Sequence, residues 1–423
     1  MQGGMSRRAF VRRCAIGLAA PAVVARAALG GPGKTAPSDR IGTGHIGVGG
    51  MGSGHLRSMV GRADVSVVAV CEVDEKRGER AYQVAGQRAT VYRDYRHLLE
   101  NRDVDAVVIA TPDHWHALMT RDACQAGKDV YCEKPLSVAI RDGRAVVEAA
   151  RRYARVVQLG TQWRSYHTGR LWAQYARNGH CGRIREVRCW HPPNPRRPAG
   201  GDREPPPTID WDLWLGPMAW RPYNPAICPA NFRWLMESGG GNIRDRGVHI
   251  LGMISWALGI DHVGPVAVQA TGTRHDGLYD VPTTMSATWE FADPAWTLRW
   301  EQPGQPMGAS FGAIVIGDRD TLVFRRPDRI AQPPKVMREA LPGEIELERS
   351  TDHRGNFLAA VRTRRRPIMD VAIGHSVTTL CNLGNVAFAL GRRLRWDPAR
   401  EEFPDDPEAN RLLSTPYREP WTL

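Results

Sequence analysis

Three side chains in this sequence, Lys134, Asp245 and His249, are of the types that handle the proton of an alcohol during oxidation. Asp245 and His249 are four residues apart, and a helix over residues 242–258 would place them on one face, one turn apart. An imidazole can accept a hydroxyl proton near neutral pH, a carboxylate can orient the ring, and an ammonium stabilises alkoxide charge. We therefore expect all three to be catalytic. The alternative is an ion pair between Asp245 and a flanking arginine, with His249 in the core.

A glycine-rich segment, Gly47-Val48-Gly49-Gly50-Met51-Gly52, stands between a strand-like run and a helical one. Glu72 follows Gly52 by 20 residues, at the end of the next β-branched run. Glycines at this spacing let a pyrophosphate approach the N-terminus of a helix, and an acid at the end of the second strand binds ribose hydroxyls. The carboxylate would repel a 2′-phosphate, so we expect NAD rather than NADP.

Strands and helices continue to alternate until about residue 159, which predicts a doubly wound parallel sheet, the Rossmann fold. Ligands of such sheets bind beyond the carboxyl ends of the strands, where Thr111-Pro112 and Glu133-Lys134 are expected. The residues expected to bind the cofactor are Gly47, Gly49, Gly50, Met51, Gly52, Glu72, Thr111, Pro112, Trp115, His116, Glu133, Lys134 and Gln162.

Two histidines, His114 and His116, flank Trp115 and raise the question of a metal site. No cysteine or acidic partner stands at a spacing that would complete a ligand set. We expect no metal, and a role for this segment in cofactor contact or helix capping.

Three segments of the first half, the glycine-rich loop, Thr111-Pro112-Asp113-His114-Trp115-His116 and Glu133-Lys134-Pro135-Leu136-Ser137, together resemble the glucose–fructose oxidoreductase and inositol dehydrogenase family (Gfo/Idh/MocA). The resemblance continues in the second half through Asp245-x-Gly247-x-His249 and the tail Pro416–Trp421. It implies an exported subgroup of NAD(P)-dependent oxidoreductases. It also implies that Lys134 contacts both cofactor and substrate, and that the Lys134–Pro135 bond is a candidate for the cis form.

From about residue 160 the pattern changes to alternating strands, for example over 185–190, 266–273 and 283–291. This predicts an α/β + α+β chain: a Rossmann domain, then an α/β domain with a large, mostly antiparallel open sheet. Eight of 14 tryptophans fall between Trp163 and Trp256, and their faces suit sugar rings. The expected substrate contacts are Lys134, Trp163, Arg164, Tyr223, Asn224, Arg233, Asp245 and His249.

The N-terminal sequence is typical of a targeting segment. Ser6-Arg7-Arg8 begins a twin-arginine pattern, a short apolar stretch follows, and Ala25-Arg26-Ala27 offers a cleavage site. We expect export by the twin-arginine translocation machinery to the periplasm, cleavage near Ala27 and no stable membrane anchor. The expected divisions are a signal peptide (1–27), a linker (28–39), the NAD-binding domain (40–160) and a substrate-binding and oligomerisation domain (161–423).

The composition, 42% apolar and 24% charged, is that of a globular protein and excludes a disordered or collagenous chain. The net charge of +12 comes with a general preference for arginine over lysine, so we expect no nucleic-acid partner. The eight cysteines include no CxxC pair, which argues against a disulfide framework and against structural zinc.

These features predict an exported oxidoreductase. It would transfer hydride between tightly bound NAD(P) and a secondary hydroxyl of a sugar, glycoside or cyclitol, in a homo-oligomer (dimer or tetramer). One alternative is a redox-neutral NAD-dependent glycoside hydrolase or lyase that oxidises the sugar transiently, which glycoside-cleavage assays would reveal. Another is a non-catalytic NAD-binding sensor, which bound cofactor without turnover would favour.

Overall fold

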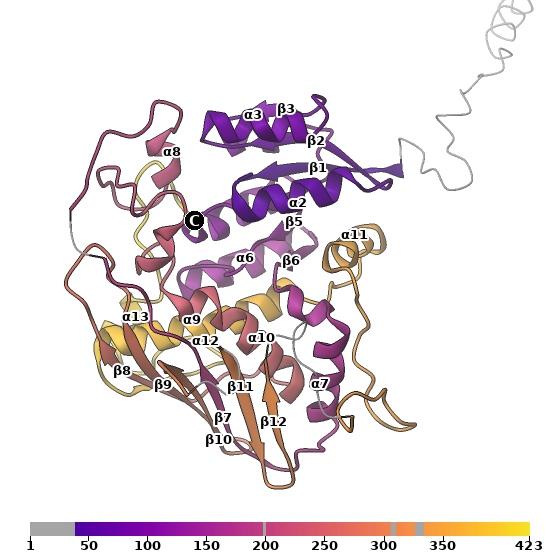
Figure 1. Ribbon diagram of the computed structural model, residues 1–423, viewed down its shortest axis with the longest axis vertical. Coiled ribbons are helices and arrows are strands. Elements are labelled where there is room, and N and C mark those ends of the chain that lie inside the picture. Colours follow the sequence, from indigo (N-terminus) through magenta and orange to yellow (C-terminus); the bar gives the residue numbers. More distant parts are fainter. Residues whose placement is uncertain (1–38, 198–199, 306–309, 326–333) are drawn as a thin grey trace, which may run out of the picture.

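The computed structural model describes residues 39–197, 200–305, 310–325 and 334–423 (Figure 1). The predicted signal peptide and nearly all of the predicted linker lie outside these residues. Within the described ranges, none of the helices combines the length and apolar character that a membrane span requires.

The first half of the chain forms a six-stranded sheet in the order β3-β2-β1-β4-β5-β6. Every neighbouring pair is parallel, as predicted for a doubly wound fold. The central strands are apolar and buried on both faces, which a parallel sheet covered by helices requires. The strands are β1 (Ile41–Ile46), β2 (Val65–Cys71), β3 (Thr90–Tyr92), β4 (Ala106–Ile109), β5 (Asp129–Cys132) and β6 (Val157–Leu159).

Helices connect these strands and begin where the sequence offers caps. Asp74, for example, accepts a hydrogen bond from the Lys76 amide and starts α3. Aspartates also cap α4 (Tyr95–Leu99), α8 (Trp211–Leu215), α11 (His353–Thr363), α12 (Val371–Leu390) and α13 (Pro407–Arg411). The helices of the first half are α2 (Gly50–Val60), α3 (Glu75–Val84), α4 (Tyr95–Leu99), α5 (His116–Gln125) and α6 (Ile140–Arg152).

The second half contains a seven-stranded sheet in the order β12-β11-β7-β10-β9-β8-β13. Only the β7–β10 pair is parallel, so the sheet is mixed and mostly antiparallel, as expected. Side chains of β9 and β10 alternate between a buried face and a more exposed one. The strands are β7 (Ile184–Trp190), β8 (Ala267–Thr273), β9 (Thr284–Phe291), β10 (Trp296–Gln302), β11 (Gly312–Gly317), β12 (Thr321–Phe324) and β13 (Leu394–Arg395).

Helices α10 and α12 lie between the two sheets (Figure 1). Both are apolar on nearly all sides and almost entirely buried, which allows α12 to contact β8 of the second sheet and β6 of the first. The remaining helices are α7 (His167–Arg177), α8 (Trp211–Leu215), α9 (Asn242–Asp245), α10 (Gly247–Leu258), α11 (His353–Thr363), α12 (Val371–Leu390) and α13 (Pro407–Arg411).

The C-terminal segments return to the first sheet. In α11, Phe357 and Leu358 pack in one cluster with Tyr131 of β5. At the tail, the Trp421 ring lies edge-on to Trp115, with ring centroids 4.8 Å apart. Long-range packing therefore ties the end of the chain to the elements that surround the cavity described next.

Candidate active site

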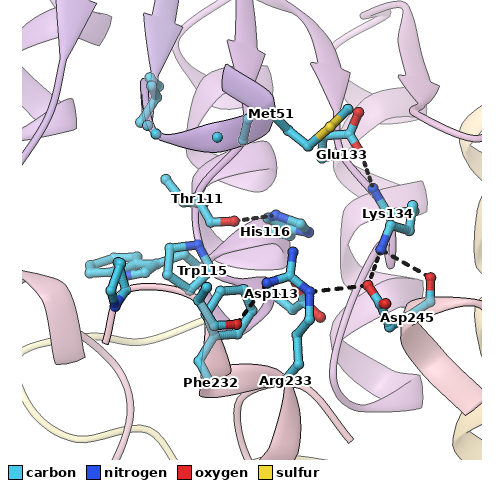
Figure 2. Close-up of a pocket in the computed structure, with 18 of the residues that line it drawn as sticks. Met51, Thr111, Asp113, Trp115, His116, Glu133, Lys134, Phe232, Arg233 and Asp245 are labelled. Atoms are coloured by element: carbon cyan, nitrogen blue, oxygen red, sulfur yellow. Dashed lines mark hydrogen bonds and ion pairs between the residues drawn. The ribbon is translucent and has the colours of Figure 1, made fainter. Parts of the chain in front are cut away.

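A cavity of about 1100 Å³ opens at the carboxyl edge of the first sheet and extends to helices α9 and α10 of the second half (Figure 2). Of the 13 residues expected to bind the cofactor, all but Gly52 line it. Lys134, Asp245 and His249 line its other end. Within the described residues, no group of three metal-ligating side chains is present.

The glycine-rich loop has the backbone that close approach to a ligand requires. Gly47 has a φ of 78°, a conformation that residues with a Cβ rarely adopt. A Cβ added at Gly50 would meet no atom within 4 Å, so this glycine leaves open space at the start of α2. Gly52 has a different role from the one expected: a Cβ there would lie 1.9 Å from the Gly47 carbonyl oxygen, so it allows α2 to pack against the loop.

The Glu72 carboxylate lies at the end of β2 and lines the cavity. It accepts hydrogen bonds from the amides of Val48, Val73 and Asp74, at 2.9, 3.0 and 3.2 Å. Burial raises the pKa of Glu72, while the Val48 and Asp74 amides act in the opposite direction. Glu72 thus connects the glycine-rich loop to the end of β2.

The segment after β4 forms one wall of the cavity. His116 hydrogen-bonds through its ring to the carbonyl oxygens of Thr111 and Pro135, at 3.0 and 2.7 Å. The Trp115 indole donates to the Trp214 carbonyl oxygen at 3.1 Å. These contacts are structural, and they hold Thr111 and Trp115 at the cavity surface. The Lys134–Pro135 peptide bond is cis, as the resemblance suggested.

Glu133 is buried and bonded to two polar side chains. His55 donates to it at 2.8 Å and Gln162 at 3.0 Å, while Arg354 of α11 donates to the other ring nitrogen of His55 at 2.8 Å. Burial alone would raise the pKa of Glu133, but His55 and then Lys134 lower it to about 2. Glu133 is therefore a carboxylate at neutral pH, held by partners from both halves of the chain.

The Lys134 ammonium is fixed by one residue of α9 (Figure 2). It donates to the Asp245 carboxylate at 2.6 Å and to the Asp245 carbonyl oxygen at 3.0 Å. Arg233 donates to the same carboxylate at 3.1 Å. Burial opposes ionisation, yet Lys134 and Arg233 hold the pKa of Asp245 well below its usual value. An ammonium has three donors, so one remains for a ligand in the cavity.

The expectation of one continuous helix over residues 242–258 is wrong. Helix α9 ends at Asp245, and Arg246 (φ −103°, ψ −33°) separates it from α10. Asp245 is therefore directed at Lys134, and the structure shows no hydrogen bond between it and His249 among the described residues. The alternative, an ion pair between Asp245 and a flanking arginine, is partly present, since Arg246 lies 3.6 Å from the Asp245 carboxylate.

His249 lies in α10 with its ring stacked on Trp163, at a centroid distance of 4.9 Å and an interplanar angle of 26°. Its Nδ1 atom is buried and has no hydrogen-bond partner among the described residues. Burial, and then the Lys134 ammonium, lower its pKa to about 3. The ring is neutral at neutral pH and can accept a proton.

Three of the expected substrate contacts do not line the cavity. Arg164 is buried away from the cavity, where it pairs with Asp261 and donates to the Gly252 carbonyl oxygen. Asn224 is buried too, and bonds to Asp202 and local backbone. Tyr223 packs edge-on against Trp211 and does not line the cavity. Hydrogen-bond partners inside the fold satisfy the polar groups of Arg164 and Asn224. Trp163 and Arg233 do line the cavity.

Sequence reasoning missed several residues of the cavity. Asp113 has a buried carboxyl oxygen without a hydrogen-bond partner in the described part of the chain, and burial raises its pKa. Arg246 and Phe311 line the same end, and Arg354 enters from α11. The only signal for Asp113 was its place in the Thr111–His116 motif, and the only signal for Arg246 was its proximity to Asp245. Nothing local indicated Arg354.

Known proteins resemble this chain over both halves. One family model, described as an oxidoreductase family with an NAD-binding Rossmann fold, matches residues 41–161. A second, the C-terminal α/β domain of the same family, matches residues 201–302 and 334–423. Both models belong to the Gfo/Idh/MocA family.

Individual proteins that are similar in sequence include inositol dehydrogenases. An inositol 2-dehydrogenase of Salmonella paratyphi B is 38% identical over 119 residues, which are 28% of this chain and 35% of that protein. This match thus spans about a third of the relative's length. An inositol 2-dehydrogenase of Burkholderia lata is 26% identical over 349 residues, 79% of this chain and 87% of the relative.

A solved structure shares the fold. The WlbA dehydrogenase of Bordetella pertussis, in complex with NADH and UDP-GlcNAcA, superposes with a TM-score of 0.65 at 17% identity, over 85% of this chain and 99% of that one. The two family models match in order, on the two sheets described above. The chain therefore belongs to the Gfo/Idh/MocA oxidoreductase family, and its first half is the NAD-binding Rossmann fold of that family.

Proposed function

We propose that this protein transfers hydride between NAD and a secondary hydroxyl group of a sugar or cyclitol. One observation carries the proposal: a single cavity has the glycine-rich loop and Glu72 at one end and Lys134, Asp245 and His249 at the other. The relatives named inositol 2-dehydrogenase support the class of substrate.

The residues at the first end of the cavity fit NAD. The open space at Gly50 and the positive φ of Gly47 suit a pyrophosphate at the start of α2, whose free amides favour an anion. Glu72 would accept from the adenosine ribose, and Glu133 lies toward the reacting end, next to Lys134. Bound here, NAD supplies the carbon that accepts or donates the hydride.

The catalytic roles follow from the charge states at the other end. His249, which is neutral and lines the cavity, takes the hydroxyl proton when the alcohol is oxidised and returns it in reduction. The free donor of Lys134 stabilises the negative charge on the carbinol oxygen. Asp245 holds Lys134 through two acceptors and so fixes the direction of that donor.

The direct experiment uses purified mature protein. Denaturation should release NAD or NADH, identified by mass, and a panel of sugars and cyclitols added to the intact protein should reduce the bound NAD, seen as nicotinamide fluorescence. Release of NADP only, or no change in the bound nucleotide with any member of the panel, would contradict the proposal.

Export and assembly also form part of the proposal. The Arg7-Arg8 pair and Ala25-Arg26-Ala27 support a signal peptide for twin-arginine export to the periplasm. Replacement of Arg7 and Arg8 by lysine should stop export, and periplasmic accumulation at wild-type level would contradict it. The extended, partly exposed face of the second sheet supports a homo-oligomer, which light scattering would test.

A further inference from the structure

The reacting end of the cavity has more positive charge than its own acids balance. Three cations surround the single carboxylate of Asp245: Lys134 at 2.6 Å, Arg233 at 3.1 Å and Arg246 at 3.6 Å. Glu133 and Asp113 also act electrostatically on Arg233. Arg354 is a further cation of the cavity, linked to Glu133 through His55, so four cations face at most three carboxylates. At least one positive charge is left for a ligand to neutralise.

The unbalanced positive charge is that of Arg246. Arg233 is engaged, because it donates to Asp245 and to the Ala230 carbonyl oxygen. The closest approach of Arg246 to Asp245 is through Nε, and its guanidinium has no hydrogen-bond partner among the described residues. Its side chain is 48% exposed.

Arg246 lies close to the groups proposed to react. It occupies the break between α9 and α10, one residue after Asp245 and three before His249. Its guanidinium carbon lies 5.8 Å from the centre of the Phe311 ring. Phe311 is in turn nearly parallel to Trp163, at 6.1 Å, and Trp163 stacks on His249. An aromatic wall thus runs from His249 to Arg246.

We propose that the substrate is a sugar acid, a polyhydroxylated ring that carries a carboxylate. This rests on the proposed function. The hydroxyl to be oxidised would lie at His249 and Lys134, a face of the ring would lie along Trp163 and Phe311, and the carboxylate would bind the terminal nitrogens of Arg246. A guanidinium presents two parallel donors, which match the two oxygens of a carboxylate.

The test compares matched pairs of ligands on the NAD-loaded protein: glucose with glucuronate, galactose with galacturonate and mannose with mannuronate. Binding is measured by calorimetry and reduction of bound NAD by fluorescence. In the wild type, at least one acid should bind about ten to a hundred times more tightly than its neutral partner, the range for a hydrogen bond to a charged group. Arg246→Gln should bring that ratio close to one. Arg349→Gln, which removes an arginine from an exposed site, should leave it unchanged.

Each outcome decides the proposal. The sugar-acid proposal would be overturned if neutral sugars bound as tightly as their acids or if no pair bound at all. It would also be overturned if the preference for acids persisted in Arg246→Gln. If glucose 6-phosphate bound more tightly than every uronate, the group bound at Arg246 would be a phosphoryl group and not a carboxylate. That result would also contradict the sugar-acid proposal. Oxidation of neutral sugars without any preference for acids would leave the hydride-transfer proposal standing. Binding of acids without any reduction of NAD would contradict the hydride-transfer proposal alone.

Discussion

Single residues in the cavity owe their charge states to their immediate neighbours. His249 is kept neutral by burial and by the nearby Lys134, with a pKa of about 3, whereas Asp245 is kept ionised by Lys134 and Arg233. The sequence predicted these three groups because their types and spacing are distinctive. It did not predict that Arg164 would be buried, because its partner Asp261 is 97 residues away and such pairing is invisible to local patterns.

A prediction at this scale concerns cofactor choice. Glu72→Ala should weaken NAD binding by ~1–3 kcal/mol, because the ribose hydroxyls lose a charged acceptor. The Val48 amide also loses its partner, so some of the loss reflects a looser glycine-rich loop. NADP should lose less, since its 2′-phosphate no longer meets a carboxylate. Calorimetric titration of nucleotide-free protein measures both affinities.

The control for this prediction is Glu75→Ala, which removes an exposed glutamate three residues further along. It should bind both nucleotides like the wild type. Unchanged NAD affinity in Glu72→Ala, or a preference of the wild type for NADP, would refute the assignment.

At the scale of elements, the sequence predicted strands of both sheets, because hydrophobic periodicity is a local signal. Expected strands at 185–190, 266–273 and 283–291 match β7, β8 and β9 to within one residue at each end. The break at Arg246 escaped prediction, because nothing in the local sequence of residues 242–258 marks the end of one helix and the start of another. The contact of Asp245 with Lys134, 111 residues away, accompanies that break and has no counterpart in the local sequence.

The C-terminal tail provides a prediction about elements. Trp421 is 6% exposed and packs on Trp115, which lines the cavity, and on Tyr95. Trp421→Ala should lower the free energy of unfolding by ~3–5 kcal/mol, the usual cost of removing a buried indole. It should also weaken NAD binding, since Trp115 loses its support. Urea unfolding and nucleotide titration measure the two effects.

Trp220, which is 65% exposed, offers the matched control. Trp220→Ala should change the unfolding free energy by less than ~0.5 kcal/mol. If the two variants lose the same stability, the tail does not contribute to the fold in the way its packing indicates.

The whole molecule should be sensitive to acid, because it buries several histidines in their neutral form. Burial lowers the pKa of His45, His114 and His249 to about 3 and that of His353 to about 4, from 6.5 in the unfolded chain. The unfolded state therefore binds more protons at any pH between these values. Stability is full above pH ~6.5 and falls as the pH drops toward 3–4.

We accordingly expect the free energy of unfolding to be level from pH ~7 to 8 and to fall below pH ~6.5, by up to ~5 kcal/mol per pH unit if all four histidines contribute fully. Asp142, whose pKa burial raises to about 6, opposes part of this loss because the native state takes up its proton first. Urea unfolding across the pH range measures the slope. A free energy that stays constant from pH 7 to pH 5 would contradict the neutral, buried histidines.

The central claim is that His249 moves the proton during hydride transfer, and single-turnover reduction of bound NAD tests it most directly. With the sugar or cyclitol that reduces the wild type fastest, His249→Ala should react ~10²–10⁴ times more slowly, the usual contribution of a positioned general base. Its NAD affinity should stay the same, because the ring lies at the reacting end and not at the glycine-rich loop. His262→Ala, which removes an exposed histidine, should react at the wild-type rate. A His249→Ala rate close to that of the wild type would contradict the account and leave His249 as a structural residue of the core.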